Sequence, residues 1–462
     1  MTAATTGKRR GIPLHTKILL GLLLGATAGV MANSFLGKDH PQLVWAVDNV
    51  ATPVGQIFLR MLFMVVVPLV FASLTLGVAG LGDLRKIGRI GAKTMGFFLF
   101  TTAFAATIGL TAVNLVKPGE ALDPDIREEL LATYSTEAAE KATLAETGGF
   151  GINTFVNIVP RNPIDAAARG DMLGLIFFSL ILGIALTRLP ADKAKPFLDM
   201  LEGLGLAVTE IIGFAMKLAP FGVFGLIFAV TARFGFEVLQ SLGLYVIMVL
   251  GGLMVHQFVV LGSFAKLLGG INPIVFFRRA RFMMITAFST SSSNATLPTT
   301  MRTAQEEFGV PKQVAGFVVP LGATMNMNGT ALFEGMTVLF LAQVFGIDLS
   351  LSSQLIVIMM SVLTAVGAAG VPGGSIPLMV MVLEMVGIPG AGIALILGVD
   401  RILDMTRTVP NVTGDLLGTI VIARSEGYTL EPATAPDFST EAALEAERHS
   451  EDEEAKHETV RV

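Results

Sequence analysis

The chain has 462 residues, of which 52% are hydrophobic and only 15% carry a charge. Because soluble globular domains carry about 25% charged residues, this composition excludes an ordinary soluble protein and predicts a polytopic membrane protein. The formal net charge of -5 comes from an acidic C-terminal segment, residues 428–462, so it indicates no nucleic-acid partner. The chain contains no cysteine, which excludes disulfides, thiol catalysis and thiolate metal sites.

Apolar runs predict six membrane-spanning helices in the first part of the chain. Their cores are residues 18–37, 61–82, 94–116, 153–187, 204–232 and 238–265. The fourth core contains Pro160 and Pro163, so we expect it to be broken into pieces. Basic residues before the first helix and after the second place these ends, with segment 1–17, on the cytoplasmic side. The acidic segment 117–150 is expected to be a solvated outer loop.

Two later segments lack charges but cannot be ordinary spans. Residues 282–301 contain a run of small polar residues from Ser289 to Asn294, and residues 349–383 contain the glycine-rich stretch Gly367–Ser375. Irregular backbone at membrane depth is tolerated only where it is buried in protein or lines a cavity. We therefore predict two re-entrant helical hairpins, the first entering from the inside and the second from the outside.

Each predicted hairpin is followed by a helix. The seventh helix, residues 313–347, is interrupted at Asn326–Thr330, and the eighth begins near Gly392. The sequence thus predicts an all-α fold of eight transmembrane helices plus two hairpins, arranged as inverted repeats. Paired interrupted segments of this kind indicate a binding site near the membrane midplane. The charged tail after Gly427 is expected to be disordered.

The eighth helix carries a polar stripe of Asp400, Asp404, Arg407, Asn411 and Asp415. At about 100° per residue, these side chains fall within roughly 80° of one helical face. Charged side chains are costly in lipid, so this face must meet protein, water or a ligand. One interpretation is a self-neutralising structural network with an Asp404–Arg407 pair. The other is a binding face for a charged solute and its coupling ions.

The sequence resembles the dicarboxylate/amino acid:cation symporter family over roughly residues 13–427. The resemblance rests on four motifs together: Ser291–Ser293 with Thr296–Pro298, Asn326–Thr330, Gly370–Gly373 and Asp404–Asp415. It implies a homotrimer in the cell (inner) membrane with both termini cytoplasmic. It also implies an elevator mechanism, with a scaffold of about residues 18–83 and 152–233 and a transport domain of about 84–117 and 235–427.

The resemblance implies a set of substrate-binding residues. Arg407 would hold a side-chain carboxylate, because its planar fork suits bidentate capture, and Asp404 would hold an ammonium group. The other members of the set are Ser292, Ser293, Thr330, Val371, Gly373 and Asn411.

The resemblance also implies two sodium sites built from oxygen donors, which suit a hard cation. One consists of Asp415 with carbonyls of Gly322, Asn326 and Asn411, and the other of carbonyls of Thr324, Ala365, Val366 and Ala368. A third would use Thr101, Thr102, Asn326 and Asn328. Asn328 stands where the family usually has Asp, so we expect fewer than three strongly bound sodium ions.

Two further departures and one acidic residue complete the candidate site. Family members usually carry an arginine at the position of Ser291 or of Met405, and this chain has neither. Pro410 is expected to interrupt the eighth helix beside Asn411. Glu334 lies in an otherwise apolar run one turn after Thr330, and intramembrane carboxylates commonly serve as proton relays. We therefore take Glu334 as the candidate proton carrier, the alternative being a neutral, hydrogen-bonded structural residue.

The sequence as a whole predicts a symporter, not an enzyme, that takes up glutamate or aspartate with sodium, with protons as a second candidate coupling ion. A C4-dicarboxylate symporter is the main alternative, and a channel is a weaker one because the polar groups gather at the interrupted segments. An intramembrane protease is disfavoured because the chain has no His-Glu-x-x-His motif, and Ser375 has no evident histidine partner.

Overall fold

The computed structural model describes residues 14–80, 89–122, 159–169, 171–368 and 370–430. Within these ranges every regular element is a helix and no β-strand occurs, which agrees with the predicted fold class. Helices satisfy their backbone hydrogen bonds internally, as a chain in lipid requires. In the described part of the chain, five helical segments are long and apolar enough to cross a membrane: Thr16–Leu36, Pro41–Ala79, Arg89–Ala121, Ala191–Phe234 and Glu237–Leu267. The full count of eight spans plus two re-entrant hairpins stays a prediction.

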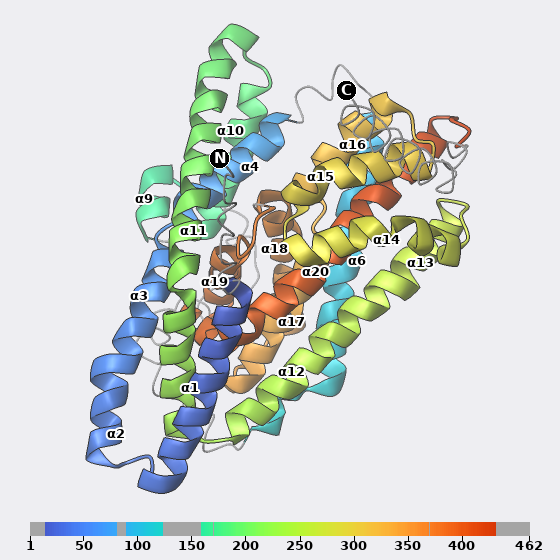
Figure 1. Cartoon of the computed structure of the whole chain (residues 1–462). Coiled ribbons are helices and arrows are strands. Elements are labelled where there is room, and N and C mark those ends of the chain that lie inside the picture. The colour runs from blue at the N-terminus through green and yellow to red at the C-terminus, as the bar shows by residue number, and fades with distance from the viewer. Residues whose placement is uncertain (1–13, 81–88, 123–158, 170, 369, 431–462) are drawn as a thin grey trace, which may run out of the picture.

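The first group of helices packs around α11 and lies on the left in Figure 1. It contains α1 (Leu14–Leu36), α2 (Pro41–Ala46), η1 (Val47–Ala51), α3 (Thr52–Phe63), α4 (Val66–Gly80), α9 (Pro163–Arg169), α10 (Met172–Leu186) and α11 (Ala191–Phe234). The 44 residues of α11 span about 66 Å, roughly twice the thickness of a hydrocarbon core. The predicted fourth span is divided into the separate helices α9 and α10, but the break between them follows Arg169 and does not lie at Pro160 or Pro163.

The second group contains the remaining helices, which extend from the centre to the right of Figure 1, except α19, which lies close to α11 in that view. In chain order they are α6 (Arg89–Val116), η3 (Pro118–Ala121), α12 (Glu237–Met254), η4 (Val255–Val260), α13 (Leu261–Leu267), α14 (Pro273–Thr290), α15 (Ser293–Arg302), η5 (Thr303–Glu307), α16 (Lys312–Met325), α17 (Asn328–Val344), α18 (Leu351–Gly367), α19 (Ile376–Met385), η6 (Gly390–Ile393) and α20 (Ala394–Ser425). The predicted boundaries between scaffold and transport domain stay predictions.

The two segments predicted as hairpins each fold as a pair of helices joined by a turn, and their re-entry into the membrane stays a prediction. In the first, Ser291 and Ser292 connect α14 to α15; in the second, residues 368–375 connect α18 to α19. The interruption of the seventh helix is also present, because Asn326 and Met327 have non-helical backbone angles between α16 and α17. These three breaks place non-helical backbone beside the middle of α20.

Three predicted boundaries are corrected. The first hairpin begins at Pro273, not at residue 282, because α14 starts there and includes Arg278, Arg279 and Arg281. The helical segment of the second span begins at Pro41, well before the predicted core, and includes polar residues such as Asp48 and Arg60. Pro410 does not interrupt the eighth helix: α20 continues unbroken from Ala394 to Ser425. A proline removes one backbone donor, but the buried packing around α20 holds the helix through that position.

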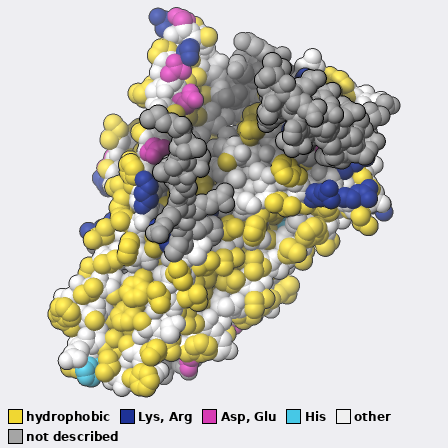
Figure 2. Space-filling model, in the orientation of Figure 1, with side chains coloured by type: hydrophobic (Ala, Val, Ile, Leu, Met, Phe, Trp, Pro, Cys, Tyr) yellow, Lys and Arg dark blue, Asp and Glu magenta, His cyan; other side chains and the backbone are white. Residues whose placement is uncertain are grey.

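Several predictions lie outside the described residues: most of the N-terminal segment 1–17, most of the loop 117–150, the basic residues near 85–86, and the tail from 431 onward. Figure 2 shows hydrophobic side chains over the lower and central part of the visible face, while charged side chains gather mainly at its upper end and edge. Large exposed hydrophobic residues include Leu24, Ile57, Phe221 and Ile247. Such extensive apolar exposure is unusual for a soluble protein and is expected for helices that face lipid.

Candidate functional site

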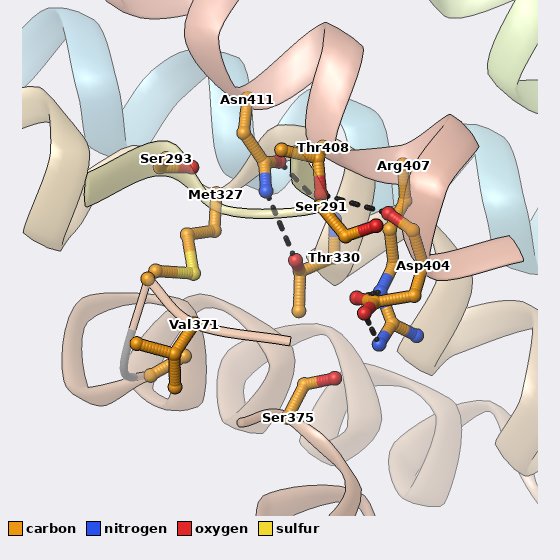
Figure 3. Close-up of a pocket in the computed structure, with 12 residues that line it drawn as sticks. Ser291, Ser293, Met327, Thr330, Val371, Ser375, Asp404, Arg407, Thr408 and Asn411 are labelled. Carbon is orange, nitrogen blue, oxygen red and sulfur yellow. Dashed lines mark hydrogen bonds and ion pairs between the residues drawn. The ribbon is translucent and has the colours of Figure 1, made fainter. Parts of the chain in front are cut away.

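A cavity lies where the two hairpin turns, the break between α16 and α17, and the middle of α20 meet (Figure 3). The cavity is small in this structure, with a volume of about 20 Å³. Its lining residues are Ser291, Ser293, Met327, Thr330, Ala368, Gly370, Val371, Ser375, Asp404, Arg407, Thr408 and Asn411. Six of the eight predicted substrate residues are among them, and Ser292 and Gly373 flank the cavity.

Arg407 is the central cation of the site and is only 1% exposed. Its Nη2 lies 2.8 Å from Asp404 Oδ1, and its Nη1 lies 3.1 Å from Asp400 Oδ1. Its guanidinium carbon also lies 4.2 Å from the centre of the Phe333 ring, which is within the range of a cation–π contact. The carboxylates of Asp400 and Asp404 and the ring of Phe333 thus fix the position of the Arg407 guanidinium group, which lines the cavity.

The carboxylate of Asp404 is shared between two groups of donors. Oδ1 accepts from Arg407, while Oδ2 accepts from the backbone N–H of Gly373 at 3.2 Å and faces Arg401 Nη1 at 3.5 Å. Arg401 is therefore the second arginine near the site, one turn before Met405. From the sequence, this cation was expected at the position of Ser291 or Met405, and the i, i+3 spacing of Arg401 and Asp404 gave a signal that could have identified it.

Asn411 fastens α20 to the beginning of α17. Its Oδ1 accepts from the backbone N–H of Gly329 at 2.8 Å, and its Nδ2 donates to Thr330 Oγ1 at 3.2 Å. The close approach requires Gly329, because a Cβ there would overlap the backbone carbonyl of Arg407. The first turn of α17 thereby presents Thr330 to the cavity.

The two hairpin turns touch each other at Gly370. Its carbonyl accepts from Ser292 Oγ at 2.5 Å and from the backbone N–H of Asn294 at 3.2 Å. Ser292 also caps α15 by accepting from the N–H of Ala295. Ser291 adopts a left-handed conformation with φ of 52°, which is uncommon outside glycine and turns its side chain into the cavity.

The first predicted sodium site has a donor set that fits the ion. Asp415 is buried, and Asn326 Nδ2 donates to its Oδ1 at 2.8 Å. The α-carbon of Gly322 packs directly against the same carboxylate. Among the described residues, no lysine or arginine lies within ion-pair distance of Asp415. A buried carboxylate without a basic partner calls for a cation or a proton, and the surrounding oxygens suit sodium.

The residues of the second predicted sodium set lie on two helices in contact, whereas those of the third set contact one another through their side chains. Ala365, Val366 and Ala368 are buried at the end of α18, which contacts α16, the helix that carries Thr324. In the third set the amide oxygens of Asn326 and Asn328 already accept from Thr101 and Thr102 hydroxyls, at 3.3 and 2.9 Å. Both amide nitrogens instead converge beside Gly414. The four side-chain oxygens of this set are neutral, so the set offers sodium no counter-charge.

Glu334 is fully buried on α17 and faces the second hairpin. Its Oε2 lies 2.6 Å from Thr364 Oγ1, and that hydroxyl also lies 2.8 Å from the carbonyl of Met360. A hydroxyl has a single hydrogen and can donate to only one of these acceptors. A proton on Glu334 would satisfy both contacts, because the carboxyl could then donate to Thr364.

Comparison with known proteins adds an independent finding. The family model described as "Sodium:dicarboxylate symporter family" matches residues 14–425. The proton/sodium-glutamate symport protein of Geobacillus stearothermophilus is 38% identical over 421 residues, which cover 90% of this chain and 96% of the relative. The proton/glutamate-aspartate symporter of Escherichia coli (strain K12) is 37% identical over 407 residues, covering 88% and 92%. The C4-dicarboxylate transport protein of Bacillus subtilis (strain 168) is 35% identical over 425 residues, covering 91% and 94%.

Proposed function

Because the chain belongs to the sodium:dicarboxylate symporter family, we propose that it takes up an acidic amino acid, glutamate or aspartate, together with sodium. Members of this family are transporters, so the prediction that the chain is not an enzyme is confirmed. The observation that carries the substrate assignment is the buried pair of Arg407 and Asp404 at the cavity. An acidic amino acid offers a carboxylate to the first and an ammonium group to the second.

The charge of the site favours an amino acid over a plain dicarboxylate. Asp400 and Asp404 both lie beside Arg407, so the guanidinium is not an uncompensated positive charge. A dicarboxylate would meet the Asp404 carboxylate with no positive group of its own, whereas an α-ammonium group is attracted to it. Relatives named for glutamate are 35–38% identical to this chain.

A C4-dicarboxylate is the second candidate substrate, and one observation favours it. Arg401 lies 3.5 Å from Asp404 Oδ2 and can neutralise that carboxylate when no ammonium group is present. The formal charges of Asp400, Asp404, Arg401 and Arg407 then sum to zero, which lowers the repulsion between the site and a second substrate carboxylate. A relative named as a C4-dicarboxylate transport protein is 35% identical.

Coupling is assigned to sodium and to a proton. Sodium binds at Asp415 with carbonyls of Gly322, Asn326 and Asn411, and at the carbonyls of Thr324, Ala365, Val366 and Ala368. Glu334 is the proton carrier, a role supported by its complete burial and its contact with Thr364. The protein is a homotrimer of the cell membrane with cytoplasmic termini, and each protomer works as an elevator.

Uptake by the purified chain in proteoliposomes tests this function. Labelled glutamate and aspartate are offered with succinate and malate as competitors, under separately imposed sodium and proton gradients. We expect saturable uptake driven by the sodium gradient, with the amino acids outcompeting both dicarboxylates. Stronger competition by succinate or malate would assign the second candidate instead. Uptake that fails to saturate would indicate a channel.

A further inference from the structure

Three buried serine hydroxyls in the described part of the chain have no hydrogen-bond partner: those of Ser291, Ser361 and Ser375. Buried polar groups are normally hydrogen-bonded, so each of these requires a reason. Ser291 and Ser375 are 2% and 5% exposed, and both line the cavity. Ser361 lies elsewhere on α18 and does not line it.

The local sequence explains why Ser375 does not use its hydroxyl within the protein. Ser375 precedes the first residue of α19, a position from which serine normally accepts a backbone N–H of the next turn. Ser292 and Ser350 make such caps to α15 and α18. Ser375 makes none. One of the two usual donors is missing because Pro377 has no N–H.

The two cavity hydroxyls come from different hairpins. Ser291 ends α14 in the first hairpin, and its left-handed backbone holds the side chain at the cavity. Ser375 belongs to the turn of the second hairpin. In the view of Figure 3, Ser291 lies above Thr330 and Ser375 lies below it, with Arg407 to the right. A ligand that accepts from both hydroxyls would therefore connect the two hairpins.

We infer that the hydroxyls of Ser375 and Ser291 donate hydrogen bonds to carboxylate oxygens of the bound substrate. A hydroxyl donates one hydrogen bond, and ionised carboxylates are the strongest acceptors among small solutes. The inference rests on the proposed function, since it concerns the substrate of the same site. It extends the binding set to two residues that sequence motifs did not single out for this role.

Calorimetric binding of glutamate and aspartate to the purified full chain in sodium tests the inference. Ser375→Ala is expected to lose about tenfold or more in affinity, because hydrogen bonds to charged groups are the stronger ones. Its thermal midpoint without substrate should not fall, since no bond within the protein is lost. Ser375→Thr, which keeps a hydroxyl, should bind closer to the wild type.

Ser361→Ala is the matched control, because it removes an equally buried, unpartnered hydroxyl outside the cavity. It should bind substrate like the wild type. Wild-type affinity in Ser375→Ala, or an equal loss in Ser361→Ala, would overturn the inference. If Ser375→Ala cannot be purified, Ser291→Ala applies the same criterion at the other hairpin.

The binding measurements distinguish a failure of the serine assignment from a failure of the proposed substrate. A wild-type protein that binds succinate and neither amino acid contradicts the proposed substrate. The serine variants are then measured with succinate, which presents the same carboxylate acceptors. A wild-type protein that binds glutamate or aspartate, with no effect of the serine substitutions, contradicts the serine assignment alone.

Discussion

At the scale of single residues, the charges buried in this protein are balanced in two different ways. Arg407 is compensated by two carboxylates of its own helix. Asp415 has only the Asn326 amide as a described side-chain partner. With Arg401 beside Asp404, the charges of the first group sum to zero, whereas the buried carboxylate of Asp415 requires an ion or a proton. This difference separates the substrate position from the ion position.

Asp415→Asn should raise the sodium concentration for half-maximal uptake by roughly tenfold or more, because the fixed carboxylate helps replace the hydration shell of the ion. Sodium-dependent uptake in proteoliposomes, measured over a range of sodium concentrations, provides the value. An unchanged sodium requirement would show that this carboxylate does not hold the coupled ion.

Glu334→Gln should leave substrate binding and exchange largely intact and should remove the dependence of net uptake on external pH. Glutamine keeps the shape and the contact to Thr364 but cannot exchange a proton at physiological pH. Net uptake and exchange are measured between pH 5.5 and 8 as a rough working range. A variant that responds to external pH as the wild type does excludes Glu334 as the carrier.

At the scale of elements, α1 and α11 approach each other along a ridge of glycines. Gly21, Gly25 and Gly29 follow each other at intervals of four and pack against the backbone of Pro220, Phe224 and Phe228 on α11. Small residues at this spacing let two membrane helices come close, so that van der Waals contact replaces the absent hydrophobic driving force.

Gly25→Ala should destabilise the protein by roughly 1–3 kcal/mol, the usual cost of overpacking, because its Cβ would lie 2.7 Å from the carbonyl oxygen of Phe224. Thermal unfolding in detergent gives the comparison. Gly213→Ala on α11 is the control, since a Cβ there meets nothing within 4 Å. Equal midpoints for the two variants would contradict close packing of α1 on α11.

A second element-scale contact joins the end of α20 to the beginning of α6. Glu426 accepts hydrogen bonds from Arg89 and Lys93, and these bonds lower its pKa from 4.5 to about 2. Since the folded-state pKa is depressed, the stabilisation is complete above about pH 4.5 and is lost only as the pH falls towards 2. The contact is therefore constant across the physiological range.

Glu426→Gln should speed amide hydrogen exchange in the first turn of α6 at pH 7, because the charge-assisted bonds to Arg89 and Lys93 weaken. Hydrogen-exchange mass spectrometry measures this. Exchange equal to that of the wild type would mean that the two helix ends are held by other contacts.

At the scale of the whole molecule, the sequence was most informative where polar residues interrupt apolar runs. Both hairpins, the break at Asn326 and Met327, and the stripe on α20 were predictable, because polar side chains and glycines in apolar surroundings mark buried irregular backbone. Helix ends were less predictable. The first hairpin was predicted to begin at residue 282, whereas the charged residues before it extend α14 back to Pro273.

Contacts between distant segments could not be predicted from residue types alone. Phe333 reads as one more apolar residue of α17, yet its ring faces Arg407. In the sequence, Ser375 belongs to a glycine-rich turn, and only the three-dimensional structure shows that its buried hydroxyl has no hydrogen-bond partner. Pro410 was expected to break α20, but tertiary packing overrides this local preference.

The central claim is that Arg407 on α20 recognises the side-chain carboxylate of an acidic amino acid, and uptake by Arg407→Ala tests it most directly. Losing a buried, hydrogen-bonded charge costs about 2–5 kcal/mol, so glutamate and aspartate uptake should fall by a factor of roughly 30 or more. Neutral amino acids, which need no such partner, should retain or gain uptake. Arg278→Ala, which alters an exposed arginine on α14, should transport normally. Glutamate uptake by Arg407→Ala at the wild-type level would contradict the account.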